Sequence, residues 1–170
     1  MKILNRHSRR FESPPERVGQ CLDSLASRRD VLWPREHWPA MTFDKPLGIG
    51  ARGGHGPIRY FVEEYHPGRR VAFRFTGPRG FDGIHAYEVE AHGVGCELRH
   101  VIDMRASGPA VLTWPLLFRP LHDSLMEDSL DKVEAHLSGR EWKRKEWPLY
   151  VRFLRKVLAR RRRRLERRFS

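Results

Sequence analysis

The sequence has no run of about 18 consecutive apolar residues, which is the length that a transmembrane helix needs. Its first residues, Met1–Phe11, also lack the apolar core and the small-residue cleavage site of a signal peptide. Cysteine is scarce, and Cys21 and Cys96 stand alone without the spacing of a metal or redox motif. These absences predict a cytoplasmic protein with two buried thiols, in which any contact with a membrane is peripheral.

An excess of charge is absent from most of the chain. The net charge is +12, but residues 140–170 hold 14 Lys or Arg and only 3 Glu, so they carry +11 of it. Residues 1–139 are therefore nearly neutral. We predict a globular domain over residues 1–139 and a basic helical tail over residues 140–170, and we expect anionic partners only at the tail.

The longest amphipathic segment is Pro109–Leu137. Apolar residues three and four positions apart predict a helix with one buried stripe. That stripe consists of Trp114, Phe118, Leu121, Leu125, Met126, Leu130, Val133 and Leu137. The opposite face is expected to meet water, and it holds Glu127, Asp128, Asp131, Lys132 and Glu134. Pro115 and Pro120 predict a kinked opening before the regular helix.

The segment before residue 58 is less regular. Lys2–Phe11 has the length of a strand, and Ser13-Pro14-Pro15-Glu16 predicts a helix that Ser13 caps and that ends near Ser27. The pairs Trp33-Pro34 and Trp38-Pro39 predict a rigid connection. Their two indoles are either core residues or walls of a ligand site.

The stretch Gly48–Pro57 contains a literal G-x-G-x-x-G pattern. A dinucleotide-binding fingerprint needs a strand before it and a helix after it, whereas Gly56-Pro57 and a strand follow here. We therefore reject that interpretation. We predict a flexible loop at the mouth of a cavity, in which His55 is able to close over a ligand.

Residues 58–105 alternate between apolar and polar side chains in segments of strand length. The predicted strands are Ile58–Tyr65, Arg69–Thr76, Gly83–Ala91 and Gly95–Arg105. The short turns between them predict an antiparallel meander with one buried and one wet face. Solvent is the expected environment of four acidic residues, Glu63, Glu64, Glu88 and Glu90. The long helix over Pro109–Leu137 is the only segment able to cover the buried face.

This order of elements resembles the START-like (SRPBCC) superfamily, which includes polyketide cyclases and lipid-transfer domains. The resemblance covers Lys2–Leu137 and is carried by Pro14-Pro15-Glu16, by Tyr65–Arg74 and by Glu127–Val133. It implies an α+β helix-grip fold, in which a curved antiparallel sheet of six or seven strands wraps around the long C-terminal helix. It also implies a cavity between sheet and helix for an apolar small molecule or lipid, although a fold does not establish a ligand.

The last hairpin predicts which residues share the concave face. A turn at His92-Gly93 places His85 opposite His100 and Tyr87 opposite Leu98, and a longer loop would shift this register by two without changing the faces. The predicted ligand-lining residues are Trp33, Trp38, His55, Phe73, Phe75, His85, Tyr87, Leu98, His100, Ile102, Phe118, Leu121 and Leu125.

Two imidazoles and a phenol beside an apolar cavity can either orient a ligand or exchange protons. His85, His100 and Tyr87 are therefore the candidate catalytic residues if the protein is a cyclase- or dehydratase-like enzyme. We expect no cofactor. We also expect no metal, because two histidines are too few and spacing reveals no third ligand.

The tail predicts a second helix over Trp147–Phe169, with Pro148 at its start. Its candidate residues for an anionic surface are Arg155, Lys156, Arg160, Arg161, Arg162, Arg163 and Arg164. Three interpretations stay open: a solvated extension, a peripheral contact with anionic lipid, and nucleic-acid binding by charge without a recognition motif. The leading hypothesis is a ligand-binding protein whose tail touches a membrane, and the oligomeric state is left open.

Overall fold

The computed structural model describes the backbone of residues 1–166 and the side chains of residues 1–161. Seven strands form one antiparallel sheet in the order β1-β7-β6-β5-β4-β3-β2. They are β1 (Lys2–Phe11), β2 (Thr42–Phe43), β3 (Arg52–His55), β4 (Ile58–His66), β5 (Arg70–Gly77), β6 (Phe81–His92) and β7 (Gly95–Ala106). The predicted meander is confirmed, and β1 closes one edge of it by pairing with β7.

The helices are α1 (Pro15–Asp23), α2 (Ala110–Thr113), the π-helical turn η1 (Trp114–Phe118), α3 (Arg119–Leu137) and α4 (Leu149–Glu166). The predicted kinked opening is confirmed, since the π-helical turn η1 separates α2 from α3. Pro115 and Pro120 each lack the N–H that a regular α-helix needs there. None of the helices among residues 1–166 combines the length and the apolar character that crossing a bilayer requires. The part of the predicted tail helix beyond Glu166 lies outside the described residues.

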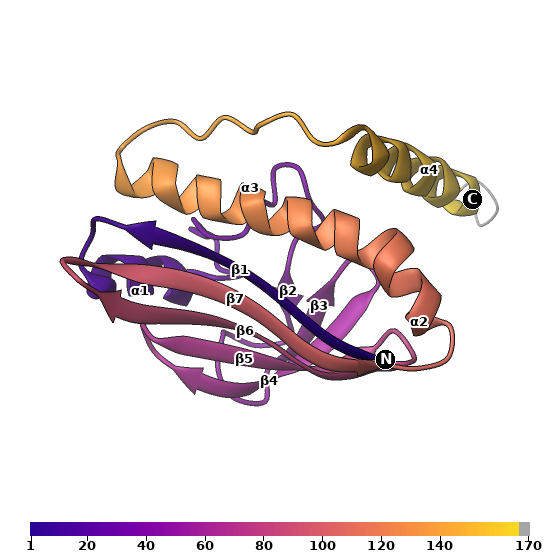
Figure 1. Ribbon diagram of the computed structural model, residues 1–170, viewed down its shortest axis with the longest axis horizontal. Coiled ribbons are helices and arrows are strands. Elements are labelled where there is room, and N and C mark those ends of the chain that lie inside the picture. The colour runs from indigo at the N-terminus through magenta and orange to yellow at the C-terminus, as the bar shows by residue number, and fades with distance from the viewer. Residues whose placement is uncertain (167–170) are drawn as a thin grey trace.

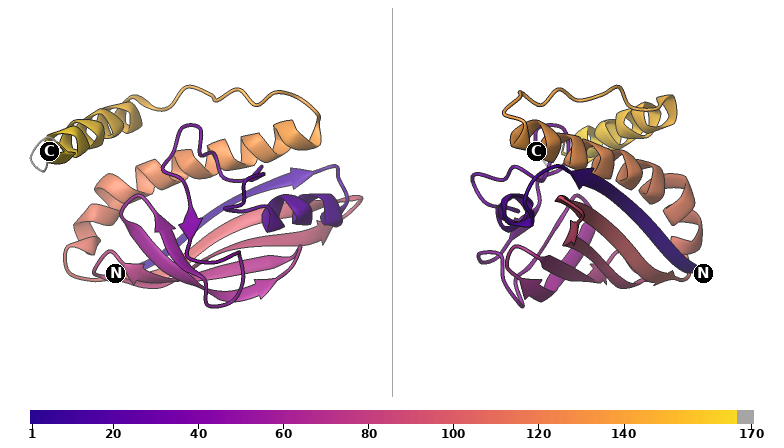
Figure 2. Two further views of the ribbon diagram at one scale, coloured as in Figure 1. Left: turned by 180° about the vertical axis from the view of Figure 1, so that it is seen from behind. Right: turned by 60° about the vertical axis from the view of Figure 1, so that its left-hand side comes forward.

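Sheet and helices form layers. α3 lies across the concave face of the curved sheet, and residues 138–148 run back along the outer side of α3 to α4 (Figures 1 and 2). The core between sheet and α3 is built from the alternate residues of each strand, such as Tyr60, Val62, Phe73 and Tyr87, which are at most 1% exposed. Cys21 and Cys96 are buried free thiols, as predicted.

The N-terminal helix differs from the prediction at both ends. Pro14 precedes α1 and no side chain caps it, so the predicted cap by Ser13 is wrong. The helix ends at Asp23 rather than near Ser27, and the Ser24 hydroxyl donates to Cys21 O at 2.7 Å.

The glycine-rich stretch is not a loop throughout. Arg52–His55 is strand β3, which pairs with β2 on one side and β4 on the other. Glycine is required because a Cβ at Gly53 would lie 1.9 Å from Thr42 O, and one at Gly54 would lie 2.0 Å from Ile58 O. The prediction of a flexible loop is therefore wrong for these four residues. A strand, and not a helix, follows the glycines, so the rejection of a dinucleotide-binding fingerprint is confirmed.

The predicted hairpin register is wrong by two residues, and the predicted faces are right. His85 lies opposite Ile102, and Tyr87 lies opposite His100. The turn is formed by Gly93-Val94, with Gly93 in the left-handed region at φ 58°, which suits a two-residue hairpin.

The four acidic residues expected to meet solvent lie at the surface, three of them half-buried and Glu90 exposed, and they pair with arginines. Glu63 binds Arg74, and Glu64 and Glu88 bind Arg70. Glu90 lies 3.1 Å from an Arg99 nitrogen. Such exposed pairs contribute little to stability.

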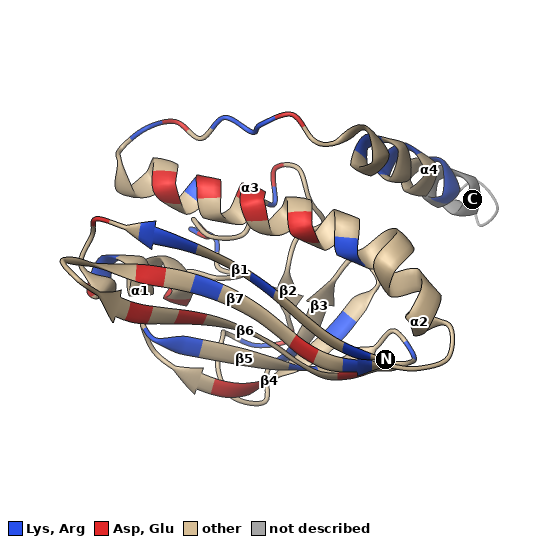
Figure 3. Ribbon diagram, in the orientation of Figure 1, with Lys and Arg blue, Asp and Glu red and all other residues tan. Residues whose placement is uncertain are grey.

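The polar face of α3 was predicted to meet water, and this prediction is wrong for much of it. Asp128, Asp131 and Lys132 are 3%, 9% and 8% exposed. Each finds a partner from a distant segment: Asp128 accepts from two tryptophans, Asp131 pairs with Arg9, and Lys132 donates to Trp33 O. Figure 3 shows the acidic residues that follow one another along α3, with the basic residues of β1 beside them.

Candidate ligand site between the sheet and helix α3

Three histidines meet between the sheet and α3. His85 (β6) and His100 (β7) are 4% and 2% exposed, and His85 Nδ1 lies 3.4 Å from His100 Nε2. The ring of His122 from α3 lies 5.0 Å from that of His100, measured between centroids. Among the described residues, His85 Nε2, His100 Nδ1 and both ring nitrogens of His122 have no hydrogen-bond partner.

Aromatic rings surround this cluster. The ring of His85 stacks on Phe73 and Phe75 with centroid distances of 4.8 and 4.9 Å. Tyr60 meets the same imidazole edge-on at 4.8 Å. The imidazoles are therefore polar groups set in an apolar wall, as in small-molecule sites.

Burial determines the protonation of these imidazoles. It lowers the pKa of both His85 and His100 well below the ordinary value, and neighbouring histidines lower the pKa further. Burial likewise lowers the pKa of His55 to about 3. All three are uncharged at neutral pH, so each offers one hydrogen-bond donor and one acceptor.

Tyr87 lies in the same layer but is already engaged. Its ring is 4.6 Å from that of His100, and its hydroxyl lies 3.4 Å from Ser129 Oγ. Because the Ser129 hydroxyl donates to Leu32 O at 2.9 Å, the phenol is the donor to Ser129. Burial raises the pKa of Tyr87, so the hydroxyl keeps its proton at neutral pH.

The structure brings most of the other predicted lining residues to this layer. Phe73, Phe75, Leu98, Ile102 and Leu125 are buried in it. Phe118 and Leu121 are only partly buried, where η1 passes into α3.

Trp33, Trp38 and His55 were also predicted to line the ligand site, and the structure brings Trp33 and His55 together. The rings of Trp33 and His55 are tilted by 53° with centroids 4.6 Å apart, and His55 Nδ1 lies 2.9 Å from the Tyr60 hydroxyl. Trp38 lies apart, because its ring meets Trp147 at 5.3 Å and its Nε1 donates to Asp128. Trp38 thus anchors the segment that precedes α4.

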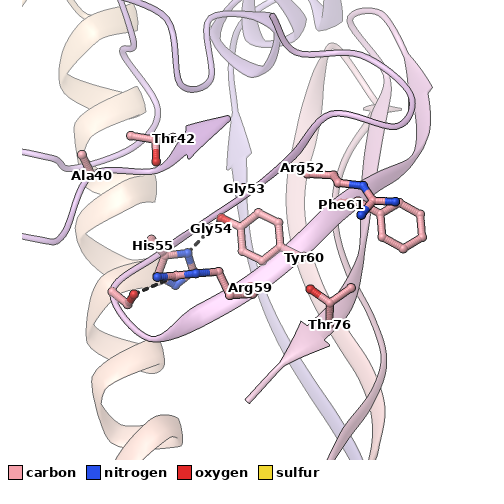
Figure 4. Close-up of a pocket in the computed structure, with 11 residues that line it drawn as sticks. Ala40, Thr42, Arg52, Gly53, Gly54, His55, Arg59, Tyr60, Phe61 and Thr76 are labelled. Carbon is pink, nitrogen blue, oxygen red and sulfur yellow. Dashed lines mark hydrogen bonds between the residues drawn. The ribbon is translucent and has the colours of Figure 1, made fainter. Parts of the chain in front are cut away.

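A hollow of about 800 Å³ lies at the β2–β4 edge of the sheet. It is lined by Ala40, Thr42, Arg52, Gly53, Gly54, His55, Gly56, Arg59, Tyr60, Phe61 and Thr76. Figure 4 shows His55 on the side of α3 and Arg52, Phe61 and Thr76 away from it. Sequence reasoning missed this hollow because it assigned β3 to a loop.

A second hollow, of about 600 Å³, lies along α4 and is basic. It is lined by Arg144, Glu146, Trp147, Arg152, Arg155, Lys156, Ala159 and Arg160. Arg155 is half-buried here, with its guanidinium 4.4 Å from the Trp38 ring centre and 4.1 Å from that of Trp147. Side chains beyond residue 161, including those of Arg162, Arg163 and Arg164, lie outside the described part of the chain.

Sequence reasoning also missed His7 and His122. His7 is on the inward-facing side of β1, the side of Ile3 and Phe11, and His122 follows Phe118 by four residues on the apolar stripe of α3. These two periodicities are the signals that could have found them.

Several solved structures resemble this chain. A solution structure from Thermobifida fusca matches with a TM-score of 0.61 at 14% identity, covering 84% of this chain and 98% of that one. CalU16 from Micromonospora echinospora matches at 0.57 and 15%, covering 92% and 91%. Ara h 8.0201 matches at 0.58 and 10%, covering 82% and 100%. The chain has the helix-grip fold.

This result confirms the resemblance to START-like (SRPBCC) proteins at the level of fold. No protein-family model matches the chain, and no curated protein matches it. The function is therefore inferred from the layer between the sheet and α3, which holds the buried imidazoles.

Proposed function

We propose that the protein binds an apolar small molecule or lipid between the concave face of the sheet and α3, with the ligand's polar group on the buried imidazoles. The observation that carries this proposal is the set of unpartnered ring nitrogens of His85, His100 and His122. A buried polar atom without a partner costs about 1–3 kcal/mol. A ligand hydroxyl or carbonyl at this position would remove that cost.

The chemistry of the wall narrows the ligand class. Neutral imidazoles suit an uncharged polar group, and the aromatic rings around His85 suit a flat or aliphatic body. Access is proposed at η1, where Phe118 and Leu121 are only partly buried. A π-helical turn is a frequent feature of functional sites.

Proton transfer is less well supported than binding. An acid or base that works near neutral pH needs a pKa near 7, whereas burial lowers the pKa of His85 and His100 well below that of free histidine. Tyr87 keeps its proton and donates a hydrogen bond to Ser129. Cyclase- or dehydratase-like turnover is therefore the alternative, and binding is the conclusion.

Two ligands with one body test the proposal. N-phenyl-1-naphthylamine serves as a fluorescent reporter, which naphthalene and 2-naphthol then displace. We expect 2-naphthol to compete about fivefold better than naphthalene, because one hydrogen bond to a buried partner is worth roughly 1 kcal/mol. The His85→Gln/His100→Gln variant should narrow that difference, and His66→Gln, an exposed control, should keep it.

Two results would contradict the proposal. One is a reporter that does not bind the folded protein, or that neither competitor displaces. The other is equal competition by naphthalene and 2-naphthol in the unsubstituted protein, which would show that the imidazoles do not bind the hydroxyl group of the ligand.

A second function is favoured by α4, and we propose that this helix contacts an anionic lipid surface. The basic hollow along α4 has five cationic side chains and a single acidic one, Glu146. Beside it, Leu149 and Phe153 are 79% and 59% exposed, and Leu116 of η1 is 59% exposed. The Tyr150 hydroxyl donates to Leu116 O at 2.7 Å and joins the two segments. Apolar side chains flanked by cations suit a bilayer interface.

Vesicles of phosphatidylglycerol and phosphatidylcholine test this contact. Each basic residue near the surface is worth about 1 kcal/mol, so Lys156→Gln/Arg160→Gln should weaken binding to phosphatidylglycerol about 30-fold. Arg69→Gln, on the turn after β4, is the matched control. Binding that persists in the double variant, or that is equal on phosphatidylcholine, would contradict the proposal.

Nucleic acid is the alternative partner for the same cations. Phe153→Ser separates the two, because it removes apolar contact and leaves every cation. The lipid proposal predicts weaker vesicle binding for this variant, whereas binding to DNA that exceeds vesicle binding and is unchanged in Phe153→Ser would favour the nucleic-acid interpretation.

A further inference from the structure

The seam between β1 and α3 brings together two imidazoles and a carboxylate that are far apart in the sequence. His7 Nε2 lies 3.1 Å from Asp123 Oδ1, and His122 Nδ1 lies 3.7 Å from the same oxygen. One donor atom from each of the three residues fits within 4.8 Å of the others. The two histidine side chains are only 13% and 14% exposed.

Two further observations show that this cluster is incomplete as it stands. Both ring nitrogens of His122 are buried without a hydrogen-bond partner among the described residues, and 3.7 Å is too long for a hydrogen bond to Asp123. Asn5, two residues before His7 on the same face of β1, donates from Nδ2 to Asp123 Oδ1 at 3.0 Å. Its Oδ1 is likewise buried without a partner.

We propose that His7, His122 and Asp123 bind one divalent transition-metal ion, with Zn²⁺ as the representative. Tetrahedral Zn²⁺ holds nitrogen and oxygen ligands at about 2.0–2.2 Å, which places neighbouring donor atoms roughly 3.3 Å apart. The distances of 3.1 and 3.7 Å lie on either side of that value. The imidazole nitrogens of His7 and His122 lie within 4.8 Å of each other, so binding of the ion requires the two rings to move closer together.

The surroundings match those of a histidine metal ligand. When Nε2 of an imidazole binds metal, its Nδ1–H usually donates to a carboxylate, and His7 Nδ1 lies 3.2 Å from Glu127 Oε1. Arg9 in turn holds Glu127 at 3.0 Å. Arg119 lies near the other Asp123 oxygen, Oδ2, at 3.6 Å and is 60% exposed, so it leaves Oδ1 to the ion.

Three protein ligands leave one tetrahedral position. A water molecule on the ion would donate to Asn5 Oδ1 and thereby satisfy that orphan oxygen. Two imidazoles select a borderline ion such as Zn²⁺ over Mg²⁺, which prefers six oxygen ligands. Only His122 is shared with the ligand layer proposed above. Zn²⁺ binding tests His7 and Asp123, whereas competition by 2-naphthol tests His85 and His100, so failure of one proposal is distinguishable from failure of the other.

The test uses the full-length protein after treatment with a chelator. Titration with Zn²⁺ in a calorimeter should show one site. His122→Ala and Asp123→Asn should each weaken it at least about tenfold, while His136→Ala, an exposed histidine of the same helix, should leave it unchanged. A tenfold excess of Mg²⁺ should not displace the ion.

Circular dichroism establishes that each variant is folded, and Asp123→Asn retains the shape of the side chain if His122→Ala does not fold. Co²⁺ gives a second measurement, because a tetrahedral site produces strong visible absorption that both variants should lose. The proposal is overturned if the unsubstituted protein binds no Zn²⁺. It is also overturned if binding is as tight in Asp123→Asn as in the unsubstituted protein.

Discussion

Acid should destabilise this protein well above the pH at which carboxylates titrate, because its interior holds uncharged histidines. Burial lowers the pKa of His55, His85 and His100 in the folded protein. In the unfolded chain each takes up a proton as the pH falls through about 6.5. The unfolded state then binds more protons than the folded state, so stability falls with falling pH.

The magnitude follows from these protonation states. At pH 5.5 a histidine that stays neutral in the fold has lost about 1.4 kcal/mol relative to pH 7.5, so three such residues together lose about 4 kcal/mol. His7 acts in the opposite direction. Burial alone would lower its pKa, but Asp123 and Glu127 raise it. Its contribution is therefore present at low pH and is lost as the pH rises. Burial lowers the pKa of His122, which acts in the same direction as the three buried histidines and opposes His7.

Urea unfolding at pH 7.5 and pH 5.5 measures this change directly. We expect the free energy of unfolding to fall by about 4 kcal/mol, a large share of the 5–15 kcal/mol typical of a domain. His85→Gln should reduce the fall by about 1.4 kcal/mol, and His66→Gln, on the surface, should not. A free energy of unfolding that is equal or higher at pH 5.5 would refute the reasoning.

Two other substitutions probe the packing. Gly19→Ala should lower the free energy of unfolding by about 2 kcal/mol in spite of the better helix propensity of alanine, because its Cβ would lie 2.4 Å from Gly68 O. Gly48→Ala is the control and should be nearly neutral, because the nearest atom to its Cβ would be 3.8 Å away. Equal losses of stability in the two variants would contradict the prediction for Gly19. Asp128→Ala removes the acceptor shared by Trp38 and Trp147. It should therefore increase hydrogen exchange in α4 far more than in β5, and unchanged exchange in α4 would show that these bonds do not hold the helix.

The elements that could be predicted are those with a local pattern. The alternation along β4–β7 and the stripe along α3 identified the sheet, its faces and its cover. The register of β6 and β7 was missed by two residues because His92-Gly93-Val94-Gly95 permits more than one tight turn. β3 was missed because its glycines resemble a loop, although they are dictated by close contact with β2 and β4.

Only the residues of the ligand site that lie on the β6–β7 hairpin could be predicted from the sequence. His85, Tyr87 and His100 share a face by parity alone, so they were found. His7 and Asp123 are 116 residues apart in the chain, and no periodicity connects β1 to α3. The burial of Asp128 and Lys132 was missed for the same reason, because their partners come from the Trp33–Trp38 segment and from Trp147.

The position of a bound apolar probe tests the central claim most directly. Nuclear Overhauser effects between N-phenyl-1-naphthylamine and methyl-labelled protein report which side chains touch it. The account predicts contacts to Leu98, Ile102 and Leu125, the buried aliphatic residues between sheet and α3. Contacts confined to Thr42 and Thr76, at the hollow beside β2–β4, would contradict it.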